Sequence, residues 1–152
     1  MKTGLSSDDT PPTTKETFMH VQPYLNFEGR CDEALEFYKK AVGAKVAMLM
    51  RWKDNPDKSM CTPGNAEKVM HSQFQIGDTT IMASDGRNTG SPNFQGIMLT
   101  IAAKNEAEVD RVFNGLAEDG QVTMPLAKTF FSPKFGMVAD KFGVGWMVLV
   151  AD

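Results

Sequence analysis

The sequence predicts an α+β fold made of two modules, each with one strand, one helix and three further strands. In both halves the hydrophobic spacing changes from period two to the helical period and back again. A shift of 74 residues also superposes apolar positions of the two halves, such as Leu25 on Leu99 and Leu35 on Val109. A duplicated module explains this pattern, because each apolar sheet face needs a helix to cover it.

The first module is predicted to follow a polar tail. Residues 1–17 are rich in Ser, Thr, Asp and Pro, and we expect them to be disordered. Residues 20–27 alternate in hydrophobicity and predict the first strand. Residues 32–42 predict a helix, because acids occupy its first turn, lysines its last, and Gly43 follows as a cap.

Three further strands complete this module, and the last two are joined by a Gly77-Asp78 turn. Their predicted ranges are 44–52, 69–76 and 79–84. The polar stretch 53–68 contains proline and glycine and predicts a long loop at one rim.

The second module repeats the plan. Its helix is predicted to begin at an Asn105 cap, with Glu108 three residues on. Its strands are predicted at 96–102, 122–130, 135–140 and 145–150. The chain is therefore expected to be one domain over 18–152, with modules at about 18–86 and 94–152.

Composition excludes several classes of protein. The net charge is -3 and no Lys/Arg cluster is present, which argues against a nucleic-acid partner. The chain has no apolar run near the ~20 residues needed to cross a membrane. Two cysteines do not make a disulfide framework and no signal peptide is recognisable, so a cytoplasmic location is expected.

Several segments carry a resemblance to a known family. They are P-Y-L-N-F at 23–27, A-L-E-F-Y-K-K-A-V-G at 34–43, His71, I-M-A-S-D at 81–85 and D-K-F-G-V-G-W-M at 140–147. Together they resemble the PhnB-like branch of the vicinal oxygen chelate superfamily, which includes glyoxalases, bleomycin-resistance proteins and extradiol dioxygenases. The resemblance implies two βαβββ modules whose eight strands form an open cup, with helices outside, a ligand inside and a homodimeric assembly.

The resemblance also raises the question of a metal. Many enzymes of this superfamily hold one divalent metal in the cup through His or Glu side chains on the first and fourth strands of each module. Those positions fall here on Gln22, Met82, Gly96 and Met147. Catalytic zinc or iron needs about three nitrogen, sulfur or oxygen donors, so we predict no metal and no cofactor.

Strand alternation then predicts an apolar ligand pocket with a few polar anchors. Trp52, near the long loop, is expected to cover its mouth. The other predicted pocket residues are Gln22, Tyr24, Gln73, Met82, Ser84, Met98, Thr100 and Met147. The chain has eleven methionines, which either fill the core or provide an adaptable surface for a ligand.

Four residues are candidates for chemistry. His71 is predicted to face the cup, where it serves either as a general acid or base or as a structural hydrogen-bonding group. Cys31 precedes the helix and is expected to be structural, because no activating base can be placed beside it. Asp85 and Asp140 end strands, where Asp usually caps a helix or a turn.

The leading hypothesis is a protein that binds a small apolar or carbonyl-containing molecule. One alternative is a metal-free lyase or isomerase that uses His71 as its acid or base. Another is a metal-dependent enzyme of the dioxygenase type, with ligands at other positions. Methyl transfer is not favoured, because the sequence has neither a nucleotide-binding βα turn nor a glycine-rich loop.

Overall fold

The computed structural model describes residues 19–151, and the predicted disordered tail lies outside the described residues. Module one consists of β1 (Tyr24–Asn26), α1 (Cys31–Val42), β2 (Lys45–Arg51), the 3-10 helix η1 (Trp52–Asp54), β3 (Val69–Ile76) and β4 (Thr79–Ser84). Module two consists of β5 (Met98–Ala103), α2 (Glu106–Ala117), β6 (Gln121–Ala127), β7 (Phe135–Ala139) and β8 (Gly145–Val150). The predicted α+β order of two βαβββ modules is confirmed.

The helix ends follow the local signals. Gly43 adopts a left-handed conformation at the end of α1, with φ of 71°. At the start of α2, the side chain of Asn105 accepts a hydrogen bond from the backbone N–H of Glu108 at 2.8 Å. The carboxylate of Glu108 accepts in return from the backbone N–H of Lys104 at 3.2 Å. A reciprocal pair of this kind satisfies backbone donors that a helix start otherwise leaves unpaired.

The first strand of each module starts later than predicted, and β6 ends at Ala127, three residues before its predicted end at 130. β1 covers three residues rather than the predicted 20–27, and Val21 is 96% exposed. β5 begins at Met98, after Gly96, whose φ of 87° is left-handed. In both cases a strand extends only as far as its parallel partner supplies hydrogen bonds, and alternation alone does not report that limit.

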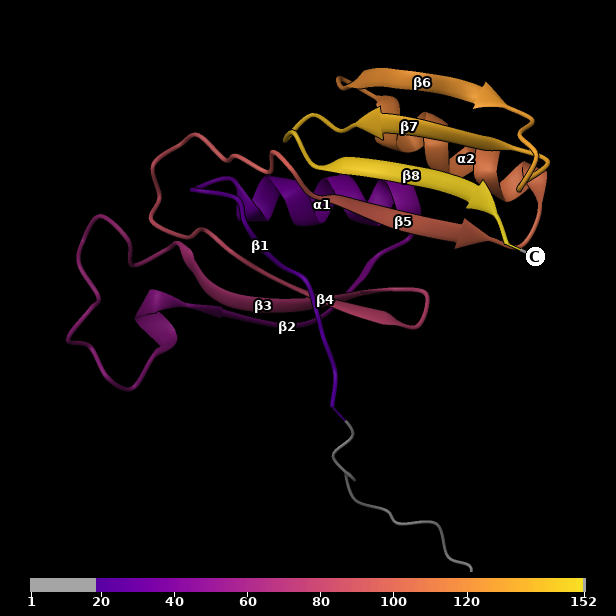
Figure 1. Cartoon of the computed structure of the whole chain (residues 1–152). Helices are drawn as coiled ribbons and strands as arrows, with labels where there is room; N and C mark the ends of the chain where they lie inside the picture. The colour runs from indigo at the N-terminus through magenta and orange to yellow at the C-terminus, as the bar shows by residue number, and fades with distance from the viewer. Residues whose placement is uncertain (1–18, 152) are drawn as a thin grey trace, which may run out of the picture.

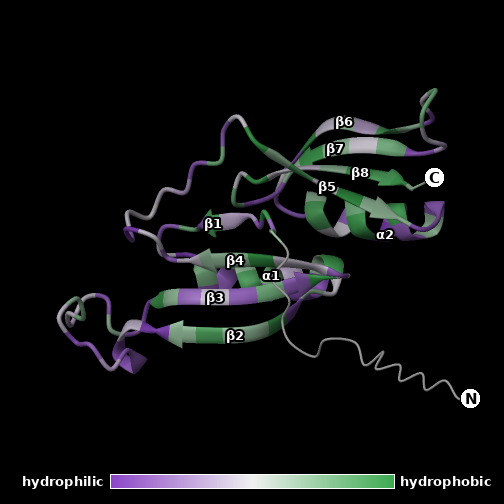
Figure 2. Ribbon diagram, turned by 60° about the horizontal axis from the view of Figure 1, so that its bottom comes forward, coloured by the Kyte–Doolittle hydropathy of each residue, from purple (hydrophilic) through white to green (hydrophobic). Residues whose placement is uncertain are grey.

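The eight strands form two four-stranded sheets, with orders β1-β4-β3-β2 and β5-β8-β7-β6. Within residues 19–151 no hydrogen-bonded ladder joins the two sheets. In Figure 1, α1 lies above the first sheet, while α2 lies behind the second. Figure 2, turned by 60°, shows α1 behind β3 and β4, and α2 below β5. Each sheet therefore has one helix-covered face and one helix-free face, and the two helix-free faces of a chain do not oppose each other.

The two modules are joined through their helices. Gly115 of α2 lies so close to α1 that an added Cβ would be 2.8 Å from the carbonyl oxygen of Ala41. Tyr38 of α1 is fully buried, and its ring packs edge-on against Trp146 of β8, with ring centroids 5.7 Å apart. One continuous core therefore lies between the two helices and the helix-covered sides of both sheets.

The buried Asp140 organises this junction. One carboxylate oxygen accepts from the backbone N–H groups of Phe142 and Val144, at 2.9 and 3.1 Å. The other accepts from the indole N–H of Trp146 at 2.9 Å and from the hydroxyl of Tyr38. The D-K-F-G-V-x-W ending therefore closes the β7–β8 turn and attaches it to α1, which is a structural role.

Asp85 has a similar role in module one. Its carboxylate accepts from the backbone N–H of Cys31, the first residue of α1, at 2.8 Å, and from the backbone N–H of Val69 at 2.6 Å. The expectation that both Asp residues act as cap or turn ligands agrees with these contacts. Among the described residues, no helix is long and apolar enough to cross a membrane.

Candidate functional site

The helix-free faces are the candidate site, because they carry His71 and most of the predicted pocket residues. The module-one face consists of Tyr24, Asn26, Met48, Met50, His71, Gln73, Met82 and Ser84, which neighbour one another across the register of the first sheet. The module-two face consists of Met98, Thr100, Met124, Met137, Met147 and Leu149 of the second sheet. Side chains between them along each strand point into the core.

The module-one face centres on a histidine and a tyrosine. The hydroxyl of Tyr24 lies 3.2 Å from Nδ1 of His71, and the two rings are stacked with centroids 5.6 Å apart. Tyr24 remains 43% exposed and His71 is half-buried. A hydrogen bond to one ring nitrogen fixes the orientation of an imidazole and leaves the other nitrogen available.

The module-two face is a row of methionines. Met147 of β8 pairs with Met137 of β7, and Met137 pairs with Met124 of β6. Met98 and Met124 are 39% and 43% exposed. Antiparallel strands that face water normally carry polar side chains on that side, so this partly exposed apolar row is a candidate binding surface.

One chain does not bring the predicted pocket residues into one cavity. Tyr24, Gln73, Met82 and Ser84 lie on the module-one face, and Met98, Thr100 and Met147 lie on the module-two face. Gln22 is exposed and precedes β1, so it belongs to neither sheet. Trp52 lies in η1, beyond the end of β2, and is half-buried. The pocket itself stays a prediction.

Four methionines on these faces were missed by the sequence analysis. They are Met48, Met50, Met124 and Met137. The M-L-M spacing at 48–50 is a period-two signal that could have placed the first two. Both β2 and β6 contain register shifts, and a bulge reverses the alternation on which such a placement depends.

The donor set of the two faces does not fit a catalytic zinc or iron. His71 supplies the single imidazole of the described faces, and the remaining donors are neutral hydroxyls, amides and thioethers. Within residues 19–151, no group of three or more His, Cys, Asp or Glu residues is placed to hold a metal ion. The predicted metal positions also shift, because Gln22 and Gly96 lie outside the strands.

Cys31 is unsuited to nucleophilic chemistry. Its side chain is fully buried, and this burial, with the nearby Asp85 carboxylate, raises the pKa of the thiol from 9.0 to about 12. A thiol must ionise to attack a substrate, so Cys31 stays inert near neutral pH.

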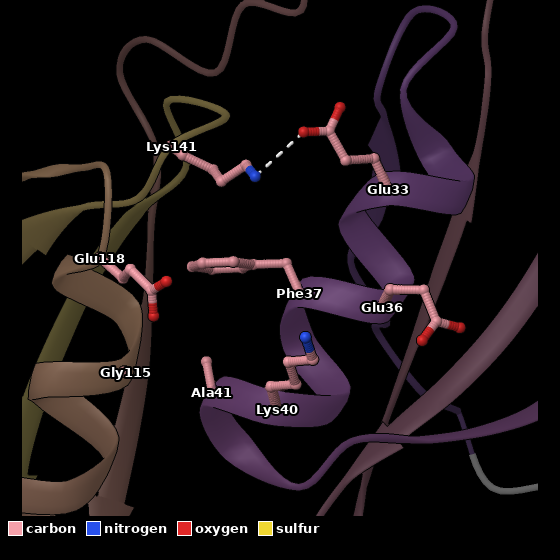
Figure 3. A pocket seen from close by; sticks show the side chains of 8 residues that line it. All are labelled: Glu33, Glu36, Phe37, Lys40, Ala41, Gly115, Glu118 and Lys141. Carbon is pink, nitrogen blue, oxygen red and sulfur yellow. Dashed lines mark ion pairs between the residues drawn. The ribbon is translucent and has the colours of Figure 1, made fainter.

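Two pockets lie away from the helix-free faces. Figure 3 shows a groove of about 270 Å³ between α1 and α2, with Phe37 in its centre and the ammonium of Lys141 3.0 Å from the carboxylate of Glu33. Hydrogen bonds from Arg30 and then from Lys141 lower the pKa of Glu33 to about 2. Glu33 is thus already paired with two cations, and none of the predicted pocket residues lines this groove.

The second pocket is a cleft of about 620 Å³ between the β3–β4 hairpin, β5 and α2. Of the predicted pocket residues, Thr100 alone lines it. Its walls combine core side chains such as Ile81, Val112 and Trp146 with polar residues at its rim, among them Glu108 and Arg111.

Comparison with known proteins identifies relatives over nearly the whole chain. Residues 19–149 match the family described as 3-demethylubiquinone-9 3-methyltransferase. Protein YjdN of Escherichia coli (strain K12) is 31% identical over 140 residues, which are 87% of this chain and 95% of YjdN. Protein PA1353 from Pseudomonas aeruginosa is 34% identical, with a TM-score of 0.77 over 88% of this chain and 98% of that one.

Two further solved structures agree. A PhnB protein from Bacillus cereus is 30% identical, with a TM-score of 0.72 over 88% of this chain and 100% of that one. A glyoxylase/bleomycin resistance protein/dioxygenase domain from Frankia is 13% identical, with a TM-score of 0.61 over 91% of this chain and 100% of that one. The last similarity concerns the fold alone, which is that of the vicinal oxygen chelate superfamily.

Proposed function

The chain belongs to the 3-demethylubiquinone-9 3-methyltransferase family, within the vicinal oxygen chelate superfamily, and from this premise we propose that it binds a small organic molecule between helix-free sheet faces. The observation that carries the proposal is the row of Met147, Met137 and Met124, which no described element covers. Flexible thioether side chains adapt to the shape of an apolar ligand.

The site requires two copies of the chain. The two helix-free faces of one chain point away from the packed helices, so neither face closes a pocket alone (Figure 1). A twofold dimer sets the module-one face of one copy against the module-two face of the other and forms two equivalent cups. Each cup then combines Tyr24 and His71 of one copy with the methionine row of its partner.

Methyl transfer, which the family description names, is not part of this proposal. A methyl donor with a nucleoside group needs a binding loop, typically glycine-rich and at a strand-to-helix turn. The β1–α1 connection of this chain contains Gly29 as its single glycine, and Asn105 caps α2 directly after β5. The described residues provide no such loop.

The decisive experiment is native mass spectrometry of untagged protein. We expect a dimer that retains a small organic molecule, and we expect Met137→Glu to lose it because a carboxylate would face the apolar wall. Met19→Glu is the matched control, since Met19 is 96% exposed and lies in neither sheet. A wild-type monomer without an adduct contradicts the proposal, and one tightly held transition metal per chain would favour a metal enzyme instead.

A second candidate function is proton transfer at a carbonyl compound, favoured by the contact between Tyr24 and His71. A base held in one orientation is suited to removing a proton next to a carbonyl group. We expect the protein to catalyse exchange of the protons next to the carbonyl group of hydroxyacetone for deuterium from deuterium oxide. His71→Gln should abolish this catalysed exchange. His20→Gln is the control, because His20 is exposed and precedes β1. Equal exchange in wild type and His71→Gln would remove this function.

A further inference from the structure

Equivalent positions of the two modules differ in chemistry on the inner strands, β4 and β3 against β8 and β7, while the outer strands β2 and β6 both carry methionines on this face. The shift of 74 residues that aligns the modules places Asn26 on Thr100. From each of these two residues, a row of neighbouring side chains runs across the strands of its sheet, and the two rows can be compared position by position. In module one Ser84 of β4 is the partner of Asn26, and His71 of β3 is the partner of Met50 of β2.

The corresponding row of module two is apolar. From Thr100 it continues through Met147, Met137 and Met124. Met147 thus takes the position of Ser84. On the same face, β7 carries Met137, whereas β3 carries His71 and Gln73. Figure 2 shows the same contrast, with hydrophilic residues along β3 and hydrophobic residues along β8.

Charge is nearly absent from both faces. Apart from Lys45 at the start of β2, no residue of the described strands on either helix-free face is an Asp, Glu, Lys or Arg. Burying a ligand charge without a counter-charge is costly, whereas a hydroxyl or carbonyl group needs a single hydrogen-bond partner. Gln73, Tyr24 and His71 offer such partners.

The apolar wall is extended at one end by an aromatic loop. Phe131 packs edge-on against Phe135 of β7, with ring centroids 5.1 Å apart, and Phe130 next to it is 99% exposed. The hydroxyl of Ser132 holds this loop, donating to the backbone carbonyl of Lys134 at 2.9 Å. An extended apolar surface suits a ligand with a long or aromatic apolar body.

We infer that the cup takes an uncharged amphiphile, whose hydroxyl or carbonyl head lies on the module-one face and whose apolar body lies on the module-two face. This inference rests on the proposed function, because the two faces meet only in a cup formed by two copies. It adds the orientation of the ligand and the exclusion of anionic heads such as carboxylates and phosphates.

The test uses probes that share one apolar chain and differ in their heads: 2-octanone, 1-octanol, octanoate and octylammonium, titrated calorimetrically into the full-length protein at pH 8. We expect both neutral probes to bind at least about tenfold more tightly than either charged one, from the desolvation of an unpaired charge. His71→Leu should weaken 2-octanone by about fivefold, the value of one hydrogen bond. Met137→Ala should weaken all four probes by a similar factor.

Lys45→Gln tests whether a lysine recruits an anionic head, because Lys45 pairs with Gln75 at the edge of the module-one face. We expect the neutral probes to remain the tighter ligands in this variant. Octanoate binding as tightly as 2-octanone, with loss of that binding in Lys45→Gln, would overturn the inference and leave the proposed function standing. If no probe binds and the native spectrum shows a bare monomer, the proposed function fails as well.

Discussion

Asp140→Asn tests whether the most characteristic segment of this chain is structural or functional. The substitution keeps the size and shape of the side chain and removes one carboxylate oxygen. If the amide oxygen takes the place of the oxygen that accepts from Phe142 and Val144, those two hydrogen bonds survive. The amide nitrogen then faces two donors, the indole N–H of Trp146 and the hydroxyl of Tyr38.

The cost follows from these two partners. Trp146 is 1% exposed, so its N–H finds no water, and a buried donor without a partner costs about 1–3 kcal/mol. The hydroxyl of Tyr38 can rotate to accept from the amide, but it loses a charge-assisted bond, which costs about 1 kcal/mol more. We therefore expect the free energy of unfolding to fall by about 2–4 kcal/mol. Removal of a buried charge keeps the loss toward the lower end.

Urea denaturation followed by circular dichroism measures this loss as a lower midpoint at constant slope. Asp78→Asn in the exposed β3–β4 turn is the matched control and should change the free energy of unfolding by less than about 0.5 kcal/mol. At temperatures where Asp140→Asn remains folded, its affinity for 2-octanone should match the wild type, because Asp140 contacts neither helix-free face. An unchanged midpoint, or folded protein that no longer binds the probe, would refute the structural role.

Other predictions concern the helix junction and the cysteines. Gly115→Ala should lower the free energy of unfolding by about 1–3 kcal/mol despite the better helix propensity of alanine, because its Cβ would meet the carbonyl oxygen of Ala41 at 2.8 Å; a stabilised variant would contradict this packing. Burial holds the pKa of Cys31 at about 12, so between pH 9 and 12 the folded chain keeps a proton that the unfolded chain releases. Stability should therefore decrease as pH rises through this range, and decrease less steeply in Cys31→Ala. A colorimetric thiol reagent at pH 8 should modify the half-buried Cys61 in the native protein and Cys31 only after unfolding; rapid modification of both would show that α1 opens.

Local signals in the sequence were sufficient for most elements. The bounds of β3, β4 and β8 agree with prediction, and the Asn105 cap forms as expected, because turns, caps and alternation depend on residues a few positions apart. The first strand of each module was predicted too early, since its length depends on a partner strand about 50 residues along the chain.

The candidate site was predictable in part. Alternation placed His71, Gln73 and Met82 on one face, and the register confirms that they are neighbours. It did not place Met124, because a bulge in β6 changes which side chains point outward, and a bulge leaves no clear mark in the sequence. Met137 lies in β7, whose pairing with β8 is regular, and simple alternation within 135–139 could have placed it.

The sequence by itself determined two βαβββ modules, their caps and turns, and an excess of methionine on strands. The tertiary structure alone decided that α1 packs on α2, with Gly115 against Ala41, and that the two helix-free faces consequently point apart. It also decided that Asp140 serves the junction of α1 and β8 rather than a ligand. The physical reason is that periodicity reports which side of an element is apolar, whereas the partner of that side is set by contacts between segments about 100 residues apart.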